Sequence, residues 1–193
     1  MSNKEDILNK IRRNIHQTFD MPTLDKLKPI TYKNTLQQFV DMSHTVGALV
    51  AELQPGQDLN EIIRKLYPEA KVFASNVAGL SIASLNPDTV SQAQELNGTD
   101  VGIVEGKVGV AENGCIWIPQ TMKERAVCFI SEYLVILLDR HAVVNNMHEA
   151  YSRIQMSDYG YGCFISGPSK TADIAQALVM GAQAARGVTV ILI

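Results

Sequence analysis

Apolar residues recur at helical spacing in the first third of the chain. Over residues 7–15 they fall on one face, which predicts an amphipathic helix near the N-terminus. A second apolar stripe over residues 36–53 predicts a long helix that ends at a Pro-Gly pair. A short third helix is predicted to begin after Asp58 and to end before Pro68. The first third of the chain is therefore expected to be helical.

From residue 70 onward the apolar period changes toward that of strands. A nearly continuous apolar run at residues 132–139 is typical of a strand buried on both faces. An alternating stretch around Asn113-Gly114 predicts a β-hairpin. Further strands are predicted at 71–75, 164–166 and 188–193. Helices are predicted at 88–98, at 145–154 with Asn145 or Asn146 as the cap, and from residue 171 toward Gly187.

Strands that alternate with helices indicate an α/β fold with a largely parallel central sheet. We expect an N-terminal helical segment, residues 1–69, to pack on a main α/β domain, residues 70–193. A chain of 193 residues with 46% hydrophobic residues can bury a full core at this size.

Composition excludes several classes of partner. The formal charge is −3 and the basic residues are scattered, so no nucleic-acid surface is predicted. No apolar run reaches the roughly 18 residues that would span a bilayer, and the N-terminus is charged. We therefore expect a soluble, cytoplasmic protein. The histidines lack metal-ligand spacing, so no metal site is predicted.

The cysteines bear on redox chemistry. Cys115, Cys128 and Cys163 are widely spaced, form no C-x-x-C pair and leave an odd count. Neither a disulfide framework nor an iron–sulfur site is readable from them. We expect reduced thiols and no cofactor bound by this chain.

A turn near the C-terminus carries candidate ligand-binding residues. After Gly167-Pro168, the chain offers Ser169, Lys170 and Thr171 directly ahead of the predicted helix. The pattern is not a P-loop, because proline stands where that motif requires lysine. A lysine at a helix N-terminus opposes the helix dipole unless an anion lies between them. A Ser or Thr N-cap beside a solvated lysine explains the same residues equally well.

Three segments carry a resemblance to a known family. "GTDVGIVEGKVGVAENGCIWI", "EYLVILLDRHAVV" and "ISGPSKTADIAQALVMGAQAARGVTVILI" resemble the lactate-utilisation protein C family, also called the LUD-domain family, over residues 70–193. The most specific part is the stretch from Ser166 to Ile174. The resemblance implies a three-layer α/β fold like that of the NagB/RpiA/CoA-transferase group. It also implies a non-redox role in bacterial oxidation of L-lactate to pyruvate, with two iron–sulfur proteins as partners that carry the clusters.

A second motif suggests a different function. Glu112-Asn113-Gly114 is similar to the Glu-Asn-Gly element of class I CoA-transferases, in which the glutamate is the nucleophile. Asn-Gly is also the preferred pair of a tight hairpin, beside which a glutamate is ordinarily solvated. A CoA-transferase-like enzyme that uses Glu112, or a carboxylate- or phosphate-binding protein, is thus the alternative to an accessory subunit.

These observations predict one pocket, where the C-terminal turn meets the hairpin. Glu112 is its candidate catalytic residue. The candidate ligand-binding residues are Asn113, Gly114, Ser166, Gly167, Ser169, Lys170, Thr171 and Asp173. Such a pocket suits a small carboxylate or phosphate.

Overall fold

The computed structural model describes residues 3–17, 19–20, 23, 27–155, 160–171 and 179–193. The helices are α1 (Asn3–Asn14), α2 (Thr35–Thr45), α3 (Leu59–Leu66), α4 (Val127–Ile130) and α5 (Met147–Arg153), with short 3₁₀ turns at Ala93–Leu96 and Arg140–Ala142. The strands are β1 (Leu49–Glu52), β2 (Phe73–Ala74), β3 (Val101–Gly106), β4 (Val108–Val110), β5 (Ile116–Pro119), β6 (Tyr133–Leu138), β7 (Val143–Val144), β8 (Gly162–Ile165), β9 (Lys170–Thr171), β10 (Val179–Met180) and β11 (Gly187–Leu192).

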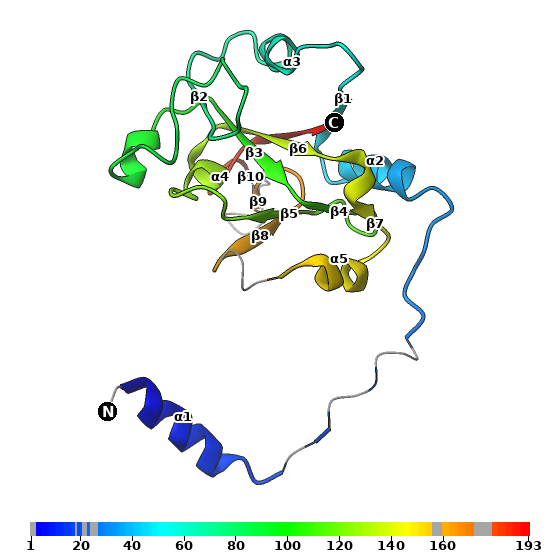
Figure 1. The fold of residues 1–193 in the computed structure, drawn as a ribbon, viewed down its shortest axis with the longest axis vertical. Helices are drawn as coiled ribbons and strands as arrows, with labels where there is room; N and C mark the ends of the chain where they lie inside the picture. Colours follow the sequence, from blue (N-terminus) through cyan, green and yellow to red (C-terminus); the bar gives the residue numbers. More distant parts are fainter. Residues whose placement is uncertain (1–2, 18, 21–22, 24–26, 156–159, 172–178) are drawn as a thin grey trace.

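A five-stranded sheet forms the centre of the protein, in the order β1-β11-β6-β3-β2 (Figure 1). All its neighbouring strands run parallel. β6 is the middle strand, and five of its six residues are buried, as its continuous apolar run predicts. The α/β class and the parallel central sheet are confirmed.

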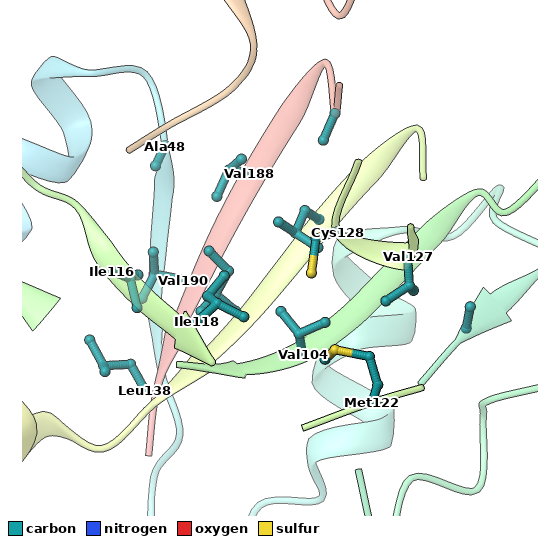
Figure 2. Close-up of a cluster of buried hydrophobic side chains, with 14 of the residues drawn as sticks. Ala48, Val104, Ile116, Ile118, Met122, Val127, Cys128, Leu138, Val188 and Val190 are labelled. Atoms are coloured by element: carbon teal, nitrogen blue, oxygen red, sulfur yellow. The ribbon is translucent and has the colours of Figure 1, made fainter. Parts of the chain in front are cut away.

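A second sheet of four strands, in the order β7-β4-β5-β8, packs on one face of the central sheet. β4 and β5 form the predicted antiparallel hairpin around Asn113-Gly114. Figure 2 shows Ile116 and Ile118 of β5 pointing into the same cluster as Val104 and Val190 of the central sheet. The sequence predicted the hairpin, but not that it belongs to a separate sheet.

Two further apolar layers complete the body. On the opposite face of the central sheet, Ile63 of α3 packs with Phe73, Ile103 and Val135. The outer face of the second sheet packs Trp117 and Val110 against the helix α5. α5 begins after Asn146, whose side chain accepts a hydrogen bond from the Glu149 backbone N–H at 3.0 Å, so the predicted asparagine cap is confirmed.

The long helix predicted over residues 36–53 is wrong in its second half. α2 ends at Thr45, and Gly47 adopts a φ of 91°, a left-handed conformation that favours glycine and ends helices. β1 then pairs in register with β11 along the edge of the central sheet. The stripe of apolar residues suits either structure, and the long-range pairing with β11 decides between them.

The N-terminal segment is thus not purely helical, because β1 is part of the central sheet. α2 packs beside β1 and β7, whereas the apolar side chains of α1 are exposed. The division of the chain at residues 69 and 70 stays a prediction. No helix in the described ranges has the length and apolar character that crossing a membrane requires.

Candidate functional site

The predicted turn follows β8 and leads into a short strand pair. Lys170 and Thr171 form β9, which pairs antiparallel with β10. The Ser169 N–H donates to the Ala185 carbonyl at 2.9 Å, and the Gly181 N–H donates to the Ser169 carbonyl at 3.0 Å. The helix predicted to run toward Gly187 is therefore wrong over 179–186, because these backbone groups pair across the chain. Asp173 lies outside the described residues.

The two turns named by the sequence lie against each other. The Ser166 hydroxyl donates to the Asn113 backbone carbonyl at 2.9 Å. The Asn113 side chain in turn accepts from the Cys115 backbone N–H at 3.1 Å, which fixes the hairpin turn. The C-terminal turn thus meets the Glu112–Gly114 hairpin, as expected, through the hydrogen bond between Ser166 and Asn113.

Both turns also approach the C-terminal end of α2, and glycine is required at each approach. Gly114 has a φ of 66°, and a Cβ placed there would lie 3.2 Å from the Met42 and Ser43 backbone. Gly167 has a φ of 64°, and its Cβ would lie 2.5 Å from the Val46 carbonyl oxygen. A larger residue at Gly167 would meet both strain and overlap.

The side chain of Lys170 is hydrogen-bonded to the same end of α2. Its Nζ donates to the carbonyl oxygen of Val46, the C-cap residue of α2. The C-terminus of a helix carries partial negative charge, so a cation is stabilised there without any anion. The expected reason for an anion, a lysine opposed to a helix dipole, does not apply to this contact. Binding of a carboxylate or phosphate by Lys170 stays a prediction.

The side chain of Glu112 is also hydrogen-bonded to the backbone. Its side chain is exposed, and its Oε2 accepts from the backbone N–H of Met147, the first residue of α5, at 3.0 Å. A carboxylate at this position satisfies a free N–H of the helix and suits the positive end of its dipole. This contact accounts for Glu112 structurally. Its catalytic role stays a prediction.

A pocket of about 310 Å³ opens beside the C-terminal turn. Ser166, Gly167, Ser169 and Lys170 line it together with apolar residues such as Phe129. Its lining does not include residues 112–114, so of the predicted site residues only those of the C-terminal turn face this pocket. Its few hydroxyl and ammonium groups on an apolar wall are compatible with a small polar ligand.

A larger pocket, of about 590 Å³, was not predicted; we call it the amino-edge pocket. It is lined by Leu49, Asp100, Tyr133 and Gly187, which lie at or next to the amino ends of the parallel strands. The sequence gives no motif for it, because its residues come from five separate segments. Tyr67 and Pro68, where the sequence predicted only the end of a helix, line it too.

Hydrogen bonds and ring contacts fix the wall of the amino-edge pocket. The hydroxyls of Tyr67 and Thr189 are 2.7 Å apart, and the rings of Tyr67 and Tyr133 pack at a centroid distance of 5.1 Å. Burial raises the pKa of the Tyr67 phenol. Arg186 binds the Glu132 carboxylate at 2.6 Å and the Tyr133 hydroxyl at 2.6 Å. The wall is therefore preformed.

The two buried thiols, Cys115 and Cys128, should be unreactive in the folded protein. Burial raises the pKa of Cys115 and of Cys128 to about 12. Because the thiolate is the reacting form, we expect iodoacetamide at about pH 8 to modify the half-buried Cys163 first. In denaturant, all three should react at similar rates. Mass spectrometry of timed samples measures this, and fast labelling of native Cys128 would contradict the burial seen here.

Comparison with known proteins places the chain in a family. The sequence model of the LUD domain matches residues 88–193. A lactate utilization protein C from Shouchella clausii is 31% identical over 102 residues, which span 50% of this chain and 44% of that protein. Another lactate utilization protein C, from a Geobacillus species, is 26% identical over 174 residues, covering 85% of this chain and 69% of that protein.

A solved structure shares the fold. The crystal structure of a DUF162 family protein from Deinococcus radiodurans superposes with a TM-score of 0.64 at 16% identity, over 85% of this chain and 99% of that one. The family resemblance found in the sequence is thus confirmed. Because the family match covers more than half of the chain, this protein belongs to the LUD-domain family.

Proposed function

We propose that this protein takes part in lactate utilisation, as a non-redox component of a system that oxidises L-lactate to pyruvate. The observation that carries the proposal is the LUD-domain match, together with two relatives named lactate utilization protein C. The Shouchella match spans under half of that relative's length. The reaction and the partners are therefore proposals for this chain.

We further propose that two cytoplasmic iron–sulfur proteins are its partners and carry the redox centres. The chain's own thiols support this division of work. It has three cysteines, whereas iron–sulfur clusters are commonly held by four thiolates. Two of the three thiols are buried, and each has a pKa raised by burial. Ligation needs accessible thiolates, which these side chains supply poorly.

A small carboxylate or phosphate could act at the pocket beside the C-terminal turn. Ser166, Ser169 and Lys170 give it hydroxyl and ammonium donors. To receive a ligand, the Lys170 ammonium would exchange its contact with the Val46 carbonyl for one with the ligand. The CoA-transferase alternative has less support, because the Glu112 carboxylate is held by the N-terminus of α5.

Growth and protein capture test the proposal together. A strain that lacks the gene should lose growth on L-lactate as sole carbon source and regain it with the wild-type gene. Tagged protein captured from lactate-grown cells should bring down cysteine-rich iron–sulfur proteins, identified by mass spectrometry. Unchanged growth of the deletion strain, or recovery of the bait alone, would contradict the proposed role.

Two variants with matched controls test the site within the same strain. If the turn binds a ligand, Lys170→Ala should impair growth on lactate, whereas Lys65→Ala, at a lysine that is 79% exposed on α3, should not. Glu112→Gln should leave growth intact if its role is to cap α5. Loss of growth with Glu112→Gln at unchanged protein level would instead support the CoA-transferase alternative.

A further inference from the structure

Helix α1 carries an apolar face that belongs to none of the apolar clusters formed by the described part of the chain. Ile7, Leu8 and Ile11 are 57%, 40% and 53% exposed, and Ile15 directly after the helix is 53% exposed. Figure 1 shows α1 well apart from the two sheets. None of the three apolar clusters formed by the described residues includes a side chain of α1. An apolar stripe on a short helix normally faces a partner surface.

The polar face of α1 is basic. Four of its side chains are basic, Lys4, Lys10, Arg12 and Arg13, and two are acidic, Glu5 and Asp6, which gives a formal charge of +2. A surface that binds α1 should therefore combine exposed apolar side chains with acidic groups at its rim.

The amino-edge pocket has both properties. Leu49 and Leu66 line it and are 61% and 37% exposed, so its wall presents aliphatic surface to solvent. Glu69, Asp100 and Glu132 also line it, against a single arginine, Arg186. Its charged residues thus sum to −2, opposite in sign to the charge of α1. A volume of about 590 Å³ accommodates several aliphatic side chains.

The connection after α1 joins the body far from this pocket. The Ile30 carbonyl accepts from the Asn146 side chain at 2.8 Å, and the Tyr32 N–H donates to the Asn145 side chain at 2.9 Å. Asn145 and Asn146 follow β7, beyond the carboxyl end of β6, whereas the pocket lies at the amino ends of the strands. The segment after α1 therefore joins the sheets near the carboxyl ends of the central strands, whereas the pocket lies at their amino ends.

We propose that the apolar face of α1 docks in the amino-edge pocket of a second copy of this chain. In a two-fold symmetric dimer the α1 of each copy would dock in the pocket of the other, which gives two equivalent contacts. Ile7, Leu8 and Ile11 would cover Leu49 and Leu66, while the basic side chains face the acidic rim. The dimer would be weakened by salt, because part of the contact is between exposed charges.

Cross-linking between differently tagged chains tests the contact directly. One chain carries Ile11→Cys and the other, of larger mass, carries Leu66→Cys; they are mixed and treated with a short bismaleimide. We expect a cross-linked product that contains both tags and is absent from mixtures with either cysteine omitted. Its absence, or a product that links only Ile11→Cys to itself, would overturn the proposal. So would a double variant that cross-links only within one chain.

Sedimentation equilibrium gives an independent measurement. Ile11→Glu should raise the dimer dissociation constant by about tenfold or more, since it places a charge in an apolar contact. Leu27→Glu, at a residue that is 51% exposed outside α1, should leave it unchanged. Unchanged circular dichroism spectra would show that both variants fold. A monomeric wild-type protein, or equal effects of the two variants, would overturn the proposal, as would binding of α1 to phosphatidylserine vesicles without dimer formation.

Discussion

Replacing Phe39 by alanine should lower the free energy of unfolding by about 3–5 kcal/mol. Phe39 lies on α2, has no exposed surface, and belongs to the largest apolar cluster. Its ring lies over Gly109 of β4, where an added Cβ would be 3.2 Å from the Phe39 Cε2 atom. The ring thus fills the space that this glycine leaves, and alanine would leave a cavity between α2 and the second sheet.

Urea unfolding followed by circular dichroism measures this loss. Phe19→Ala is the matched control, because Phe19 is 81% exposed and its removal leaves no cavity. We expect the control to change the free energy of unfolding by less than about 0.5 kcal/mol. A loss below about 1 kcal/mol for Phe39→Ala would mean that α2 is not fixed to the sheets as described.

Much of the fold was predictable from local sequence patterns. Strands buried on both faces have nearly continuous apolar runs, and β6 and β11 show them clearly. The Asn-Gly turn and the asparagine cap of α5 have local chemistry that specifies one backbone geometry. These elements were predicted correctly because each one is determined by residues close together in the sequence.

The elements that the sequence missed depend on distant residues. β1 carries a pattern that suits helix or strand, and only its pairing with β11, more than 130 residues later, makes it a strand. β10 lies where a helix was expected, and its pairing with β9 satisfies its backbone instead. Tertiary hydrogen bonds override local propensity at both places.

The candidate site divides in the same way. The sequence predicted that the C-terminal turn meets the hairpin, and the two are in contact because both follow strands of one sheet. It did not predict that α2 would lie behind both turns, so the partner of Lys170, the Val46 carbonyl, was unforeseen. The amino-edge pocket was missed since its residues share no motif. Prediction of a site from sequence fails where the partner group belongs to the backbone of a remote element.

Gly162→Ala should destabilise the protein by about 2 kcal/mol, as overpacking of a rigid core does. A Cβ at Gly162 would lie within overlap distance of the Cζ2 and Cη2 atoms of Trp117 on the neighbouring strand β5. Trp117 is only 5% exposed, and its ring packs against Phe164 at a centroid distance of 5.0 Å. The ring therefore has little room to move away from the new Cβ. Urea unfolding of Gly162→Ala measures the expected loss of unfolding free energy.

Trp117→Phe should reverse most of that effect, which separates ring overlap from other costs of Gly162→Ala. Phenylalanine lacks the indole atoms that the new Cβ would meet. It also lacks the Trp117 Nε1, which is buried without a hydrogen-bond partner among the described residues, so no bond is lost. The double variant should lose about 1–2 kcal/mol less unfolding free energy than the sum of the losses of the two single variants. Because independent sites add to within about 0.5 kcal/mol, additivity here would show that Gly162 is required for its backbone and not for the tryptophan ring.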